Sequence, residues 1–309
     1  MPTKKILLID DISKRNGGAN ERSRALHTLT AQLAKTLKAE AHFLYIEDLP
    51  ENLRKRTRIP PLEKRNPLLI SELNEDLAAT KIPWTLHFDS GLPVEKILKW
   101  NRGMQPYLTV MGTKGLRGLS KFVLGSVAEE VLRRATNPIV VVGPNSKETS
   151  FMKGKKSLRI LVLTDLSGAS LPCEEYAKHF AKAWGAQVTL FHAVGETALH
   201  LKNLAYSSRF PIYDIDAQIE DLKSWSRKEL QKRQNQFQKE GVSTRSLFSE
   251  KESPLKKIIP DIVENNYDFL VMGTHARNKL LTAFFGSSAR EACRVSPCPV
   301  IIVRATKGS

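Results

Sequence analysis

The stretch LTVMGTKGLRGLSKFVLGSVAEEVLRRATNPIVVV at residues 108–142 recurs as FLVMGTHARNKLLTAFFGSSAREACRVSPCPVIIV at residues 269–303. A shorter pair precedes these copies: KKILLIDDIS at residues 4–13 and SLRILVLTDLS at residues 157–167. The second member follows the first by 154 residues in the short pair and by 161 residues in the long pair. Solenoid repeats have periods of roughly 20–50 residues, so this much longer period predicts a duplicated domain.

The segment between the copies, GPNSKETSFMKGKKS at residues 143–157, is rich in Gly, Ser and Lys and contains a proline. Such composition favours an irregular connection. We therefore expect one domain at residues 1–146 and a second at residues 155–309. When the chain is divided after residue 148, each half has 24 Lys and Arg against 16 Asp and Glu, so each carries half of the net charge of +16.

Within each copy, short β-branched or Leu-rich runs alternate with segments of helical length. This order predicts right-handed βαβ units and an α/β fold, with a doubly wound five-stranded parallel sheet in each domain. Ligands of such sheets bind beyond the carboxyl ends of the strands, where the strand order reverses. The expected strands are residues 6–10, 41–46, 82–88, 108–112, 138–142, 159–164, 187–193, 242–248, 269–273 and 299–303. The expected helices are residues 20–38, 94–102, 126–135, 171–184, 215–239, 255–265 and 287–294, and Trp225 is predicted to pack against the sheet.

Composition excludes several classes of protein. Hydrophobic residues make up 41% and charged residues 26%, which is typical of a globular domain rather than a disordered chain. No apolar run approaches the roughly 18 residues that span a bilayer, and the amino terminus lacks a secretory signal pattern. Three cysteines without CxxC spacing argue against a structural zinc site. We expect a cytoplasmic protein with no membrane insertion and no metal site. The net charge favours an anionic partner.

The most specific motif is Gly112-x-x-Gly115, then nine residues, then Gly125-Ser126. It joins an expected strand to an expected helix, where glycines allow close approach to a phosphate and helix amides favour negative charge. The motif is neither a Walker A loop nor a dinucleotide-binding GxGxxG. Glycines are also common in plain βα turns, and Ser is an ordinary N-cap. The glycines alone leave phosphate binding and a plain turn open.

Taken together, the glycine motif, the Asp-x-Ser after the first strand and the Pro-led final strand resemble the universal stress protein family. The resemblance covers both halves. It implies Rossmann-like domains of the adenine nucleotide alpha hydrolase-like type. It also implies that the halves pair through their last strands as an intramolecular pseudo-dimer.

In nucleotide-binding members of that family, ATP or a related adenine nucleotide occupies this site. The resemblance implies that Asp11 contacts the ribose, that the backbone of Ile46 contacts adenine, and that Met111 lines the pocket. The phosphates are expected on the glycine motif, with Mg²⁺ as a companion ion. The implied phosphate-binding residues are Gly112, Gly115, Gly125 and Ser126.

The second copy keeps most of these positions but departs at one. Ala276 replaces the middle glycine, and an alanine forced to positive φ costs on the order of 1 kcal/mol. We therefore expect weak or no nucleotide binding there, or a different ligand. The retained positions are Asp165, Ala193, Met272, Gly273, Gly286 and Ser287.

The expected function is stress-response regulation, in which a bound nucleotide biases interaction with a regulatory protein partner. No catalytic residue is assigned, and at most slow ATP hydrolysis or autophosphorylation is expected. One alternative is a sensor or carrier of another small anionic ligand, held by the second copy. Another is an RNA-binding stress protein that uses its basic surface. The basic, Pro-rich segment at residues 49–67 is favoured as a solvated loop over a lid or RNA contact. Assembly into a homodimer stays open.

Overall fold

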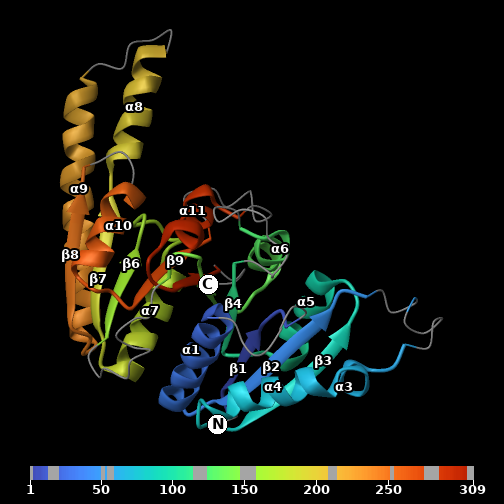
Figure 1. The fold of residues 1–309 in the computed structure, drawn as a ribbon. Helices are drawn as coiled ribbons and strands as arrows, with labels where there is room; N and C mark the ends of the chain where they lie inside the picture. The colour runs from blue at the N-terminus through green and yellow to red at the C-terminus, as the bar shows by residue number, and fades with distance from the viewer. Residues whose placement is uncertain are drawn as a thin grey trace.

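The computed structural model describes residues 3–12, 21–49, 53, 59–113, 124–146, 158–207, 214–250, 254–274 and 285–304. Each half is a βα repeat, as the sequence predicts (Figure 1). The first half contains β1 (Lys5–Ile9), α1 (Glu21–Leu37), β2 (Glu40–Glu47), α3 (Leu62–Arg65), α4 (Pro67–Ala78), β3 (Trp84–Ser90), α5 (Pro93–Met104), β4 (Leu108–Gly112), α6 (Ser126–Arg134) and β5 (Ile139–Val142). The second half contains β6 (Arg159–Leu163), α7 (Leu171–Trp184), β7 (Gln187–Ala193), α8 (Gly195–Ser207), α9 (Ile215–Lys239), β8 (Thr244–Ser249), α10 (Pro254–Glu264), β9 (Phe269–Gly273), α11 (Ser287–Val295) and β10 (Val300–Val303).

The strands of the two halves form one sheet in the order β3-β2-β1-β4-β5-β10-β9-β6-β7-β8. All neighbouring strands are parallel except β5 and β10, which pair antiparallel, with Val140 opposite Ile301. This pairing confirms the expected pseudo-dimer joined through the last strands. It also gives each five-stranded half only one free edge, since the other edge is covered by the partner half.

Alternating side chains of each buried strand face two hydrophobic clusters, one on each side of the sheet. In β1, Ile6 and Leu8 belong to one cluster and Leu7 to the other. At the junction, Val140 and Ile301 belong to the first cluster, whereas Val141 and Val300 belong to the second. Both clusters therefore continue across the junction, as expected for a parallel sheet covered by helices on both faces.

Local sequence explains where several helices begin and end. Pro93 occupies the first turn of α5, where its missing N–H costs nothing, and the left-handed Gln105 ends that helix. In α7, Pro172 plays the same part at the start, and Gly185 ends the helix at φ +59°, a conformation that glycine adopts without strain.

The sequence did not predict α3, α4 or α8. Residues 59–67, expected to be part of a loop, include α3 and the first residue of α4, while residues 50–52 and 54–58 lie outside the described part of the chain. α8 lies against α9, and both helices extend well beyond the sheet (Figure 1). The expectation that Trp225 packs against the sheet is wrong. Its side chain is 50% exposed, because it faces away from the buried Ile219, Ser226 and Leu230 of the same helix.

Candidate functional site

The predicted site residues of the first half gather at the carboxyl edge of three adjacent strands. β1 lies between β2 and β4, so the strand order reverses at this point. Asp11 follows β1, and Met111 pairs with Ile9 in register, one residue before Gly112 ends β4. Ile46 lies near the end of β2 and shares a hydrophobic cluster with Met111. This is the edge at which ligands of doubly wound sheets bind.

The start of α6 is held at the same edge. The Gly125 amide donates a hydrogen bond of 2.7 Å to the Thr113 carbonyl, which brings the helix start against the residue after β4. Gly125 is the N-cap and has no side chain to occupy the first-turn amides, and Ser126 is exposed. Amides in this arrangement can take an anion. Gly115 lies outside the described residues.

Three buried polar residues, Asp10, Ser23 and His27, lie next to this site and were not predicted from the sequence. Asp10 is buried, its carboxylate lies 3.6 Å from the imidazole Nε2 of His27, and Ser23 is a further hydrogen-bond partner. Burial by itself raises the pKa of Asp10, but the hydrogen bonds from His27 and Ser23 lower it overall. Asp10 therefore stays ionised beneath the site. The consecutive residues Asp10 and Asp11 after β1 were the sequence signal that could have identified Asp10.

The second half repeats the layout. Asp165 follows β6, Ala193 ends β7, and Met272 and Gly273 end β9. The Gly286 amide donates a 3.0 Å hydrogen bond to the Thr274 carbonyl, as Gly125 does to Thr113. Ser287 is the first residue of α11 and is exposed. Ala276, on which the expected loss of binding depends, lies outside the described residues.

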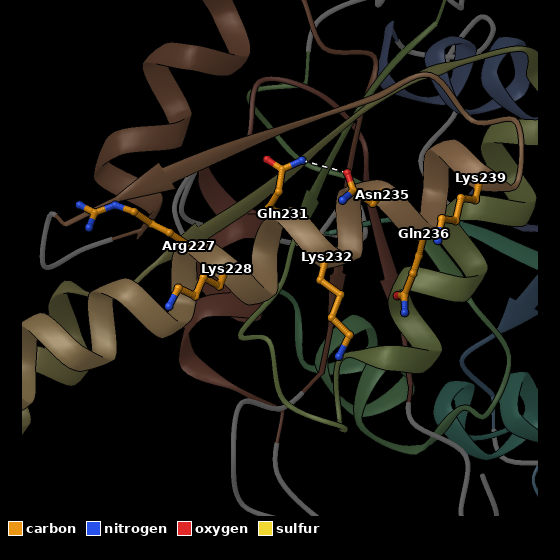
Figure 2. A pocket seen from close by; sticks show the side chains of 7 residues that line it. All are labelled: Arg227, Lys228, Gln231, Lys232, Asn235, Gln236 and Lys239. Atoms are coloured by element: carbon orange, nitrogen blue, oxygen red, sulfur yellow. Dashed lines mark hydrogen bonds between the residues drawn. The ribbon is translucent and has the colours of Figure 1, made fainter.

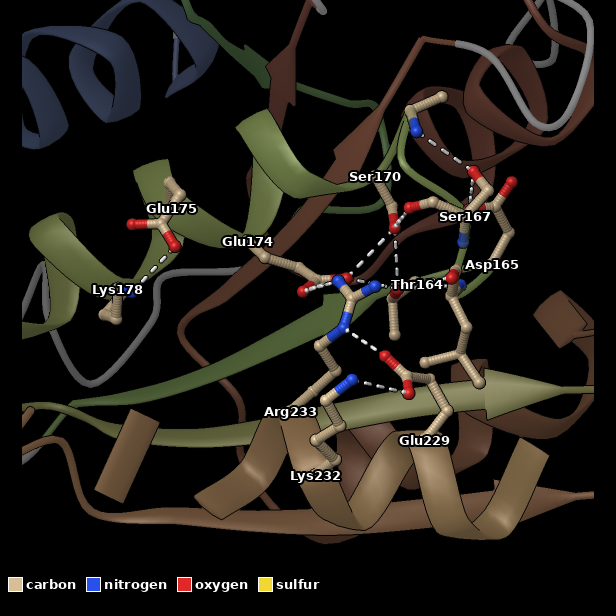
Figure 3. Close-up of polar contacts among 12 residues, drawn as sticks. Thr164, Asp165, Ser167, Ser170, Glu174, Glu175, Lys178, Glu229, Lys232 and Arg233 are labelled. Atoms are coloured by element: carbon tan, nitrogen blue, oxygen red, sulfur yellow. Dashed lines mark hydrogen bonds and ion pairs between the residues drawn. The ribbon is translucent and has the colours of Figure 1, made fainter. Parts of the chain in front are cut away.

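The carboxylate of Asp165 stabilises its own loop through one oxygen, whereas the other oxygen has no hydrogen-bond partner among the described residues. Its Oδ1 accepts hydrogen bonds from the Ser167 amide (3.0 Å) and hydroxyl (2.7 Å), as Figure 3 shows. Its Oδ2 is buried and has no hydrogen-bond partner among the described residues. Leu166 between them adopts φ +60°, which is strained for a leucine and is the kind of backbone found at binding sites.

A buried ion pair connects this loop to the long helix α9. Glu174 is 2% exposed, and its Oε2 lies 2.6 Å from Nη1 of Arg233 (Figure 3). The other carboxylate oxygen, Oε1, accepts hydrogen bonds from Thr164 (2.5 Å) and Ser170 (3.0 Å). Arg233 also contacts Glu229 and the Leu166 carbonyl. Sequence reasoning missed this network, since Glu174 and Arg233 stand 59 residues apart.

His192 and the three cysteines are buried in the described part of the chain. His192 is buried and donates from Nδ1 to the Thr164 carbonyl at 2.8 Å. All three cysteines are buried, and burial raises the pKa of the Cys298 thiol to about 12. Among the described residues, no group of three or more His, Cys, Asp or Glu could hold a metal ion. None of the described helices is long and apolar enough to cross a membrane.

A second candidate surface lies on the outer face of α9. A groove of about 620 Å³ follows the carboxyl-terminal part of this helix (Figure 2). Its lining is basic and amide-bearing, with no acidic side chain. The lining residues are Arg227, Lys228, Gln231, Lys232, Asn235, Gln236 and Lys239.

Comparisons with known proteins agree with this geometry. The model of the Universal stress protein family matches residues 3–143 and again residues 157–304. Universal stress protein YxiE of Bacillus subtilis is 25% identical over 146 residues, which cover 47% of this chain and 98% of that protein. A universal stress protein structure from Archaeoglobus fulgidus has the same fold over 99% of this chain and 97% of its own, at a TM-score of 0.65 and 21% identity. A structure from Pseudomonas aeruginosa, described as a putative universal stress protein, covers 98% of this chain and 93% of its own, with a TM-score of 0.60 and 14% identity. The chain therefore belongs to the Universal stress protein family and carries two of its domains in tandem.

Proposed function

We propose that this is a cytoplasmic regulatory protein of the stress response whose first domain, residues 1–146, binds ATP or a related adenine nucleotide. The second domain, residues 155–309, binds it weakly or holds a different small anionic ligand. Nucleotide occupancy biases the contact with a regulatory protein partner.

The observation that carries the proposal is the meeting of Asp11, Gly112 and the start of α6 at the switch point of the first half. Gly112 has no side chain, and this leaves room at the strand end for the guanidinium of Arg22. The amide of Gly125 is engaged by the Thr113 carbonyl, but the first-turn amides of α6, which begins at Ser126, have no side-chain cap and favour phosphate. Ile46 and Met111 supply the apolar surface for a base. Mg²⁺ would have to be held chiefly by the phosphates, since the described residues offer no group of three or more His, Cys, Asp or Glu for a metal ion.

The proposal is tested by isothermal titration of the whole chain with ATP, with and without Mg²⁺. We expect one ATP per chain. Asp11→Asn should weaken binding by about tenfold or more, because a hydrogen bond to a charged group is lost. Asp165→Asn, the matched change in the second half, should leave it unchanged. The reverse pattern would move the site to the second domain, and no heat in the wild type would reject nucleotide binding.

RNA binding is the second candidate function, and the basic face of α9 favours it. Lys228, Lys232 and Lys239 lie on the same helical face as the exposed Trp225, at spacings of three, four and seven residues. Glu229 contacts both Arg233 (3.0 Å) and Lys232 (3.4 Å), so Lys232 has one acidic neighbour. Lysines that neutralise phosphates, combined with an exposed aromatic ring, suit single-stranded nucleic acid.

This candidate is tested by retention of single-stranded RNA over a salt series. Replacing the three lysines by Ala should reduce the slope of log K against log salt by about 2, since each phosphate contact contributes about 0.7. The matched control replaces the exposed Lys35, Lys64 and Lys99, which changes the net charge equally. Equal losses in both triple variants would show that only overall charge matters, and absent retention would remove the candidate.

A further inference from the structure

An arginine covers the bare face of Gly112 in the first half. Arg22 is in the first turn of α1, a helix that packs on β1 and β4. A Cβ placed on Gly112 would lie 2.0 Å from Nη2 of Arg22 and 2.6 Å from its Cζ. The guanidinium therefore fills the space that a side chain at position 112 would take. Arg22 thus lies at the carboxyl end of β4, the edge at which the ligand of the first half is proposed to bind.

The positive charge of Arg22 is incompletely compensated in this position. Its Nε is buried and has no hydrogen-bond partner among the described residues. The carboxylates of Asp10 and Asp11 attract the guanidinium, but Asp10 is already engaged by His27 and Ser23. Burial lowers the pKa of the Arg22 guanidinium, and the attraction of the two carboxylates does not restore it. A partly buried cation that lacks acceptors gains most from an anionic ligand.

The sequence position that corresponds to Arg22 is not a cation in the second half. The amide of Ala39 donates to Ala34 after α1, and the amide of Ala186 donates to Ala181 after α7, so corresponding positions differ by 147 residues. By this correspondence Arg22 matches Ala169, whereas Ser23 matches Ser170. The arginine therefore belongs to the first site and not to the fold that the two halves share.

We propose that Arg22 makes the first site selective for ligands that carry a phosphate. The guanidinium presents paired N–H donors, whose geometry matches a phosphate and not a neutral ribose. A phosphorylated nucleotide supplies the missing acceptors when it enters. Adenosine has no phosphate to supply these acceptors. It must displace the guanidinium of Arg22 or bury its positive charge without an opposite charge. This inference rests on the proposed function and specifies the ligand class of the same site.

The test compares ATP, AMP and adenosine binding to the wild-type chain and three variants by isothermal titration. In Arg22→Gln, which keeps a polar side chain but is shorter and has no charge, ATP and AMP affinity should fall about tenfold, because a charge-assisted hydrogen bond is lost. Adenosine affinity should hold or rise. Arg22→Lys should recover part of the loss, since lysine restores charge but not the paired donors. Lys35→Ala, which removes an exposed charge from the same helix, should bind like the wild type.

The decisive quantity is the ratio of AMP affinity to adenosine affinity, measured on variants whose melting temperatures show that they are folded. A ratio that falls in Arg22→Gln supports the proposal. An equal loss for all three ligands would assign Arg22 a purely structural role and overturn it, as would an unchanged ratio. A wild-type chain that binds none of the three would overturn the proposed function, and this inference with it.

Discussion

The carboxylate of Glu129 on α6 and the guanidinium of Arg290 on α11 lie 2.5 Å apart, at corresponding positions of the two halves. The offset between these residues is 161, the same as between Val140 and Ile301, which pair across β5 and β10. The pseudo-twofold axis therefore runs through this junction. In a homodimer of identical domains, each position would face its own copy and carry a like charge. Duplication in one chain allowed the two copies to become complementary.

Reversing one of these charges tests that complementarity. Arg290→Glu should place two carboxylates together and lower the free energy of unfolding, by up to about 1 kcal/mol because both side chains are partly exposed. The double variant Glu129→Arg with Arg290→Glu should recover the loss. Urea denaturation at low and high salt measures both, and the effect should shrink as salt rises. The single variant Glu129→Arg is measured as well. A double variant whose loss equals the sum of the losses in the two single variants would contradict a direct pair.

Close backbone packing at the junction makes a second prediction. A Cβ on Gly143, just after β5, would lie 2.5 Å from the Cys293 carbonyl oxygen in α11. Because that atom belongs to a helix backbone, it cannot swing aside. Gly143→Ala should destabilise the chain by about 1–3 kcal/mol in urea denaturation.

Gly103 provides the matched control. It lies within α5 and a Cβ there would meet nothing within 4 Å. Gly103→Ala should stabilise the chain by about 0.5–1 kcal/mol, because alanine loses less backbone entropy in a helix. If both substitutions shift the urea midpoint in the same direction, the close approach at Gly143 is not a constraint.

The buried pair of Glu174 and Arg233 makes a third prediction. Arg233→Ala leaves the carboxylate of Glu174 buried without its cation, so the loss of stability should be about 3–5 kcal/mol. Adding Glu174→Gln to that variant should recover part of the loss, since the uncompensated charge is gone. Lys232→Ala, at an exposed neighbouring position, should change stability by less than about 0.5 kcal/mol. Equal effects of Arg233→Ala and Lys232→Ala would show that the pair is unimportant.

Ion pairs between α7 and Glu240, the residue that caps α9, make the free energy of unfolding depend on pH. Hydrogen bonds from Lys178 and Lys182 lower the pKa of Glu240 from 4.5 to about 2. A carboxyl group whose pKa is lower in the folded state stabilises the fold above its unfolded pKa. The stabilisation is therefore present above about pH 4.5 and is lost as the pH falls towards 2.

Glu240→Gln should lower the urea midpoint at pH 7, and the difference from the wild type should close between pH 4.5 and 2. Glu63→Gln, at an exposed position on α3, should track the wild type throughout. A difference for Glu240→Gln that persists at pH 2 would show that the side chain acts through packing and not through charge.

Strongly patterned segments were predictable from the sequence, and weakly patterned ones were not. The strands Gln187–Ala193 and Phe269–Gly273 and the helix Leu171–Trp184 have the bounds that their apolar patterns predict. α8 was missed because GETALHLKNLAYS has only weak amphipathic character. It lies against α9, so tertiary contact and not local pattern accounts for it. The prediction for Trp225 was wrong because the sequence alone does not show which face of α9 packs against the sheet.

The sequence by itself determined the duplication, the α/β class, the pairing through the last strands by family resemblance, and the strand ends that carry Asp11 and Gly112. Except for the strand pairing, which only the resemblance implied, these features are local or periodic, so residue pattern specifies them directly. Only the tertiary structure decided that Arg22 covers Gly112, that Arg233 neutralises Glu174, and that Glu129 meets Arg290. Each of these contacts joins residues on different elements far apart in the chain. Their distances are set by how helices pack on the twisted sheet, which no local pattern records.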